Sequence, residues 1–326
     1  MTETIHVTCL GAKARELLAR LDFSGQVIAV VSDAVYLQLR SPEQSKTAPQ
    51  SPPLFQTGQG QVVWLTQNQV KHQRAILCAC ESSALRVGMR LTHQDKFLRF
   101  ENGVLLNWTD ASEWQPSIIT GDQATTREIV SMRVRGLFNA LQALGSLGGF
   151  AQFLPLIFLD APSSPTSSPF VNAAMNPIAA IARACRNGDL TRAIESSRAL
   201  IGLGQGLTPS GDDFIGGMLF AVRYLKDSFP GSIDWNQATI DDLLASARDE
   251  TNAISYTILC DHAAGQSIDA LHDLLNTLLI EKKSDELVAL AQRVVNLGNT
   301  SGWDMLAGAL TGMLSIDSFD RRRPMA

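Results

Sequence analysis

The sequence predicts an α+β protein of two domains, an antiparallel β domain (barrel or sandwich) over residues 1–120 and an all-helical domain over residues 121–326. In the first part, short apolar runs alternate with turn residues, which is typical of strands. After residue 120, apolar residues recur at helical spacing. The 326 residues are 45% hydrophobic and 18% charged, so the chain has enough apolar side chains for two cores.

Within the β domain we expect a helix near residues 12–21 and a hairpin turn at Glu101-Asn102-Gly103. The stretch 41–53 is rich in Ser, Pro, Gln and Lys and predicts a loop. Cys78 and Cys80 alternate in an apolar run, so we expect two buried thiols on one face of a strand rather than a metal or redox site. The runs that predict strands are 26–31, 35–39, 61–65, 97–100 and 104–108.

The second domain is expected to consist of helices joined by short connections. Gly145, Gly148 and Gly149 indicate a helix stop, and the Ser- and Pro-rich stretch 160–169 indicates a loop. The segments with helical patterns are 126–144, 177–186, 190–201, 211–226, 240–264, 268–281, 285–297 and 302–314.

Charge and composition exclude several classes of function. The formal net charge is -5, and the one dense basic run, residues 321–323, is expected to be a solvated tail, so we expect no nucleic-acid partner. No stretch of about 18 apolar residues occurs, so we expect no membrane partner and a cytoplasmic location. The five histidines and five cysteines show no metal-ligand spacing.

Residues 202–217 are the most informative segment, with the sequence Gly-Leu-Gly-Gln-Gly-Leu-Thr-Pro-Ser-Gly-Asp-Asp-Phe-Ile-Gly-Gly. Three alternating glycines lead into a proline turn, and two adjacent acids follow at the head of an apolar helix. Each glycine costs backbone entropy on ordering, so packing alone has little use for so many. The segment therefore predicts a loop shaped for close approach of a ligand to the backbone.

The last predicted helix repeats this motif. Residues 210–219 align with residues 301–310, with Ser, Gly, Asp, Gly and Leu at the same five places, and each copy follows an apolar segment that ends in Leu-Gly. This similarity predicts two helix–turn–helix units related by pseudo-symmetry, with chance as the alternative. We expect the two copies to face one shared pocket.

Helix capping explains part of the motif. Ser210 and Ser301 are expected to be N-caps, with Asp213 and Asp304 completing capping boxes three residues later. Gly217 and its counterpart Gly308 are expected to allow close helix packing.

Capping leaves other residues of the motif unexplained, and these carry the prediction of a functional site. Thr251 and Ser255 lie one turn apart on the predicted helix 240–264, either bonded to the backbone or facing solvent, or else lining this site. Asp261-His262 is better explained by a structural or surface role. The candidate catalytic residues are Asp212, Asp213 and Asp304, and the candidate substrate-binding residues are Gly204, Gly206, Thr208, Ser210, Gly211, Thr251, Ser255, Asn299, Ser301 and Gly302. No cofactor is required by the sequence, although Mg²⁺ bound by Asp212 and Asp213 is possible.

The string at 202–213, followed by Gly-Asn-Thr-Ser-Gly-Trp-Asp at 298–304, resembles the bacterial family of AllH-type oxamate carbamoyltransferase subunits. The resemblance implies a role in anaerobic allantoin and purine breakdown, where oxalurate and phosphate interconvert with oxamate and carbamoyl phosphate. It also implies a hetero-oligomer with other carbamoyltransferase subunits, so that the chain alone can be inactive. Asp212 and Asp213 would then orient amide N–H groups or hold a metal. No arginine adjoins the loop, so arginines for phosphate would come from Arg127, Arg133 or Arg135, or from a partner subunit.

Two alternatives stand beside this interpretation. The chain can be a non-catalytic ligand-binding or scaffold subunit, in which the motif caps helices and docks a partner. It can also be a different small-molecule hydrolase or lyase of the same family.

Overall fold

The structure is a computed structural model that describes residues 4–20, 23–40, 61–67, 70–80, 82–117, 126–143, 145, 147–161, 168–231, 233–279 and 284–317. The predicted loop 41–53 and the basic run 321–323 lie outside these residues, as does most of the predicted loop 160–169.

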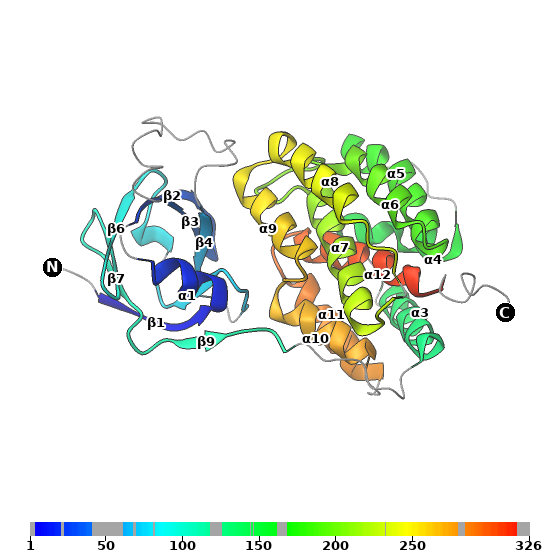
Figure 1. Ribbon diagram of the computed structural model, residues 1–326, viewed down its shortest axis with the longest axis horizontal. Helices are drawn as coiled ribbons and strands as arrows, with labels where there is room; N and C mark the ends of the chain where they lie inside the picture. Colours follow the sequence, from blue (N-terminus) through cyan, green and yellow to red (C-terminus); the bar gives the residue numbers. More distant parts are fainter. Residues whose placement is uncertain are drawn as a thin grey trace. The chain divides into compact units, whose positions relative to one another are not determined.

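The chain divides into two compact units, Met1–Pro116 and Ser117–Ala326. The first contains the strands and the second contains the long helices (Figure 1). The predicted α+β fold class is therefore confirmed.

The strands of the first unit form a barrel. The sheet order is β5-β4-β3-β2-β6-β7-β8-β1-β9, and pairing of β5 with β1 closes eight strands into a ring, with β9 added on β1. Of the two architectures that the sequence left open, the barrel is the observed one. The elements of this unit are β1 (Thr4–Gly11), α1 (Ala12–Leu18), β2 (Ser24–Val30), β3 (Ala34–Arg40), β4 (Gln61–Thr66), β5 (Ala75–Cys78), η1 (Ser82–Ala84), β6 (Arg90–Gln94), β7 (Phe97–Phe100), β8 (Leu105–Asn107) and β9 (Ser112–Trp114).

The strand pairs are not all antiparallel, which corrects the prediction. β1 pairs in parallel with β8 and β9, and β4 pairs in parallel with β5. The hairpin turn at 101–103 is confirmed, since Gly103 has φ +92° and β7 pairs antiparallel with β8. Hairpins are readable from turn residues, whereas the pairing of strands distant in sequence is not.

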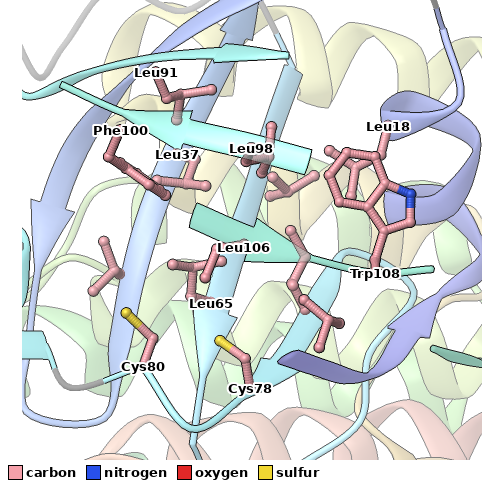
Figure 2. Close-up of a cluster of buried hydrophobic side chains, with 14 of the residues drawn as sticks. Leu18, Leu37, Leu65, Cys78, Cys80, Leu91, Leu98, Phe100, Leu106 and Trp108 are labelled. Carbon is pink, nitrogen blue, oxygen red and sulfur yellow. The ribbon is translucent and has the colours of Figure 1, made fainter. Parts of the chain in front are cut away.

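Alternating side chains of the strands fill the interior of the barrel (Figure 2). Leu37, Leu98 and Leu106 are fully buried there, and Trp108 closes the core beside α1. Cys78 and Cys80 both point into this core, which confirms that they are buried, although β5 ends at Cys78 and Cys80 lies just beyond the strand.

The second unit is helical. Its elements are α3 (Arg127–Ala143), η2 (Gly149–Phe153), α4 (Leu154–Leu159), α5 (Pro169–Arg186), α6 (Leu190–Ser197), η3 (Arg198–Leu200), α7 (Ser210–Ser228), α8 (Gln237–Glu250), α9 (Ala253–Ala263), α10 (Asp269–Leu279), α11 (Ser284–Val295) and α12 (Ser301–Met313).

Two of the predicted helices differ in extent. The single helix expected over 240–264 is two helices, because Thr251 is extended and the Asn252 side chain accepts hydrogen bonds from the amides of Ile254 and Ser255 to start α9. The helix expected to start at Pro177 starts at Pro169 instead, since either proline suits a first turn.

Helices α7 and α12 lie side by side and make their most extensive contacts with each other (Figure 1). A Cβ at Gly217 would lie 2.0 Å from the carbonyl oxygen of Met305, and a Cβ at Gly308 would lie 1.9 Å from that of Phe214. Phe214 and Met305 occupy equivalent places in the two sequence copies, so the contact is reciprocal. The predicted close packing at these glycines is confirmed, and it brings the N-termini of the two helices together.

Candidate functional site at the N-termini of α7 and α12

The two serines that begin the repeated helices do not cap them. The N-cap residues are Pro209 and Thr300, and neither makes a side-chain capping bond. Ser210 and Ser301 are instead the first residues of α7 and α12. The predicted capping boxes are therefore wrong, because the serine hydroxyls bond across to the other helix.

The serine of each copy hydrogen-bonds to the aspartate of the other copy. Ser301 and Thr208 hydrogen-bond to Asp213, while Ser210 and Thr300 hydrogen-bond to Asp304. The Thr208 and Ser301 hydroxyl oxygens lie 2.8 Å apart, so the two loops meet directly. Each serine thus serves the aspartate of the opposite copy, which joins the two helix N-termini into one site.

Asp213 and Asp304 form a buried acid pair. Asp213 is 4% exposed and Asp304 is fully buried, and the Oδ2 atom of each has no hydrogen-bond partner within the described part of the chain. Burial, reinforced by the charge of Asp304, raises the pKa of Asp213 well above its ordinary value. Burial also raises the pKa of Asp304, against the hydrogen bond from the Phe150 amide to Asp304 Oδ1, which is 2.5 Å long.

Asp212 has a different role from its neighbour, because successive helix residues point about 100° apart. One carboxylate oxygen accepts from the amide of Gly202 at 2.8 Å, and the other accepts from the hydroxyls of Thr251 and Ser255. Burial raises the pKa of Asp212, and these three hydrogen bonds oppose the rise. Both oxygens of Asp212 are hydrogen-bonded within the chain, and its role as a catalytic residue or metal ligand stays a prediction.

The same contacts settle the position of Thr251 and Ser255. Both hydroxyls donate to the same oxygen of Asp212, from the end of α8 and from α9, and so help to hold the glycine loop. Substrate binding by the two residues stays a prediction. The Asn252 side chain adds a hydrogen bond to the carbonyl of Leu207 at 2.7 Å. The junction between α8 and α9 therefore anchors the loop.

The glycines of the loop follow from its backbone. Gly202, Gly204 and Gly206 have φ values of +68°, +128° and +100°, which favour glycine. A Cβ at Gly204 would lie 2.6 Å from the amide nitrogen of Ser210, whereas at Gly206 nothing lies within 4 Å. Gly204 thus lets the loop fold against the start of α7, and Gly206 is the exposed position open to a ligand.

Gly211 and Gly302 are packing residues. A Cβ would lie 1.8 Å from the Leu200 carbonyl oxygen at Gly211 and 2.0 Å from that of Val294 at Gly302. Their amides donate to equivalent leucines of the two copies, Leu203 at 2.8 Å and Leu297 at 3.1 Å. These two amides are therefore engaged within the chain, and substrate binding by Gly211 and Gly302 stays a prediction.

The acid pair lies beneath a polar rim. Thr208 and Ser301 are half-buried, while Gly206 and Asn299 on the two adjoining loops are exposed. The structure therefore brings together Asp213, Asp304 and the hydroxyls around them, close to two exposed loop residues.

One part of the site was missed in the sequence. The start of η2 covers Asp304, where a Cβ at Gly149 would lie 2.3 Å from Asp304 Oδ1 and a Cβ at Gly148 would lie 2.5 Å from the Trp303 ring. Consecutive glycines immediately before Phe150 were the available signal, and they were interpreted as a helix stop. They permit the Phe150 amide to reach the aspartate.

The arginines considered for phosphate binding are engaged elsewhere. Arg133 donates to the carbonyl of Leu278, and Arg135 pairs with Asp317 at 2.8 Å. Arg127 is half-buried at the start of α3. Among the described residues, no arginine or lysine forms an ion pair or hydrogen bond with the acid pair.

Fold and site together define a two-unit α+β protein whose helical unit contains a buried acid pair, built from two pseudo-symmetric helix N-termini. The model of the family described as oxamate carbamoyltransferase subunit AllH matches residues 200–313, the segment that contains both copies. The match supports the family resemblance that the sequence motif carries, over this segment of the chain. No curated protein and no solved structure matches the chain. Within the described residues, no helix combines the length and apolar character needed to cross a bilayer.

Proposed function

We propose that this chain is a subunit of a carbamoyl-transferring enzyme related to oxamate carbamoyltransferase, and that the joined N-termini of α7 and α12 are its contribution to the substrate site. The observation that carries the proposal is the family match over residues 200–313, which includes Asp213, Asp304 and their hydroxyl partners. Following the resemblance, we extend the proposal to oxalurate phosphorolysis in anaerobic allantoin breakdown, in a cytoplasmic hetero-oligomer.

The proposed reaction places defined demands on a site. Phosphate oxygen bonds to the carbamoyl carbon of oxalurate, the bond from that carbon to the oxamate nitrogen breaks, and oxamate leaves with a proton on this nitrogen. Amide N–H groups of substrate and product need acceptors, and two carboxylate oxygens, Asp213 Oδ2 and Asp304 Oδ2, have no partner among the residues that the structure describes. Developing negative charge is favoured near the positive ends of α7 and α12.

The test uses the chain co-expressed with its partner subunits, measuring carbamoyl phosphate formed from oxalurate and phosphate. We expect Asp213→Asn and Asp304→Asn each to lower turnover by about 100-fold or more while the complex still assembles, because both variants disturb the same acceptor pair. Asp273→Asn removes an equal formal charge from an exposed carboxylate paired with Arg293 and should leave turnover unchanged.

Wild-type turnover in either acid-pair variant would contradict the assigned role. A changed melting temperature with unchanged turnover would instead support the scaffold alternative, in which the repeat only joins two helices.

A further inference from the structure

We propose that Asp213 and Asp304 together hold a divalent cation of the Mg²⁺ or Mn²⁺ type, between the N-termini of α7 and α12. The inference concerns the site of the proposed function, and it rests on that function only for the identity of the anion that the cation would hold. It replaces Asp212 by Asp304 as the second carboxylate ligand.

The first step is electrostatic. The two carboxylates are 4% and 0% exposed, they repel each other, and no basic side chain among the described residues pairs with them. Buried charge that is neither paired nor coordinated carries a large desolvation cost. The pair therefore needs either a proton or a cation.

The second step concerns the hydrogen bonds. Ser210, Ser301 and the Phe150 amide donate hydrogen bonds to the carboxylates, yet the Oδ2 atom of each carboxylate is buried and has no partner in the described part of the chain. A cation contacting both Oδ2 atoms satisfies the two oxygens at once.

The third step is the donor chemistry. Each copy contributes one carboxylate and one serine hydroxyl, so all the donors are oxygens, which suit hard cations rather than zinc or copper. Among the described residues no group of three or more His, Cys, Asp or Glu side chains could hold a metal. Mg²⁺ is commonly bound through one or two carboxylates and keeps water or phosphate oxygens in its other positions.

The last step concerns anion binding at the rim, which consists of Thr208, Ser301 and their exposed neighbours. Thr208 and Ser301 are half-buried, and Gly206 and Asn299, two residues before each of them, are exposed. A cation at this place attracts a phosphate that the bare acid pair would repel. Phosphate binding would then not require Arg133 or Arg135, which are engaged elsewhere.

The experiment uses the full chain alone and Mn²⁺ as the probe, with binding followed by electron paramagnetic resonance of free Mn²⁺ and by thermal melting. We expect a single class of saturable site, competed by Mg²⁺ and weakened at least about tenfold in Asp213→Asn and Asp304→Asn. Asp273→Asn should bind as the wild type does. Mn²⁺ should raise the melting temperature of the wild type more than that of either acid-pair variant, because a ligand stabilises the folded protein that binds it more tightly.

Absence of saturable Mn²⁺ binding to the wild type up to about 1 mM would overturn the inference. Unchanged affinity in both acid-pair variants would overturn it as well. If a variant fails to fold, Ser301→Ala keeps both carboxylates, and its weaker Mn²⁺ binding would support the site while wild-type affinity would count against it. Because no substrate is present, intact Mn²⁺ binding together with no carbamoyl transfer would reject only the proposed function.

Discussion

Gly211 and Gly302 are positions where hydrogen is the only side chain that fits, since an added Cβ would lie 1.8 Å and 2.0 Å from backbone oxygens of the preceding segments. Backbone cannot rotate away as a side chain can, so the helix start itself must move. We expect Gly211→Ala and Gly302→Ala each to lower the free energy of unfolding by about 3 kcal/mol or more, measured by urea denaturation.

Gly136→Ala is the matched control for these two variants. Gly136 lies within α3, is exposed, and has nothing within 4 Å of an added Cβ. There the same substitution should raise stability by about 0.5–1 kcal/mol, because glycine costs more backbone entropy than alanine in a helix. Equal effects at Gly136 and Gly211 would show that helix propensity, not contact, controls both positions.

Asp212 and Asp213 show why a pattern of adjacent residues leaves their roles open. The two are consecutive in sequence, yet one binds Gly202, Thr251 and Ser255 while the other faces Asp304. Helical geometry predicts that the two side chains point in different directions. Only the packing of α9 and α12 decides which aspartate binds the loop and which belongs to the acid pair.

At the scale of elements, the sequence predicted the repeat but not the hydrogen bonds from the serine of each copy to the aspartate of the other. Five matching residues in two copies, with glycines at 217 and 308, predicted two similar helices in close contact, and α7 and α12 pack in this way. The serines cross to the opposite aspartate because the glycine contact brings the helix starts within hydrogen-bond reach. Local propensity does not predict this hydrogen bond between the two copies, because a serine at the start of a helix is most often expected to be its N-cap.

β2, β3, β4, β7, β8 and most helices were likewise predicted from periodicity, whereas β1, β6, β9, α4 and the parallel strand pairs were not. α4 spans Leu154–Leu159, too short for a helical period to stand out. β1 and β8 are neighbours in the sheet, but most of the first unit's sequence separates them. Their parallel pairing therefore depends on closure of the whole sheet.

The segment between α9 and α10 joins two buried histidines, and one of them predicts a pH dependence. The amide of Ser267 donates to Nε2 of His272 at 3.1 Å, and the Ser267 hydroxyl lies 3.0 Å from Nε2 of His262. Burial lowers the pKa of His272 to about 4, against the opposing charge of Asp273. The ring is therefore neutral in the folded protein over a range where the unfolded chain is protonated.

Because the unfolded state binds more protons between about pH 6.5 and pH 4, the contribution of His272 to stability is complete above pH 6.5 and is lost as the pH falls. The full loss is on the order of 3 kcal/mol. His272→Gln keeps an acceptor for the Ser267 amide. We expect this variant to lack the part of the pH dependence of the free energy of unfolding that comes from His272. Urea denaturation at several pH values measures it, and parallel slopes for the two proteins would exclude His272 as its source.

At the scale of the whole molecule, the two units have separate means of stability. The barrel has its own apolar core and closes its sheet by pairing β5 with β1, which protects the sheet edges. All the residues of the candidate site, from Gly149 to Asp304, lie in the second unit. Stability of the barrel and binding at the acid pair are therefore separable properties of the chain.

We accordingly expect residues 1–116 to fold alone, with a β-type circular dichroism spectrum and a cooperative thermal transition. Leu98→Ala, at a fully buried core position, should destabilise this fragment by about 2–5 kcal/mol. Residues 117–326 should bind Mn²⁺ as the full chain does, because the fragment keeps α7, α12 and η2 together. A first fragment without a cooperative transition would show that the barrel core is insufficient by itself. A folded second fragment that binds no Mn²⁺, beside a full chain that does, would mean that the first unit supplies part of the site.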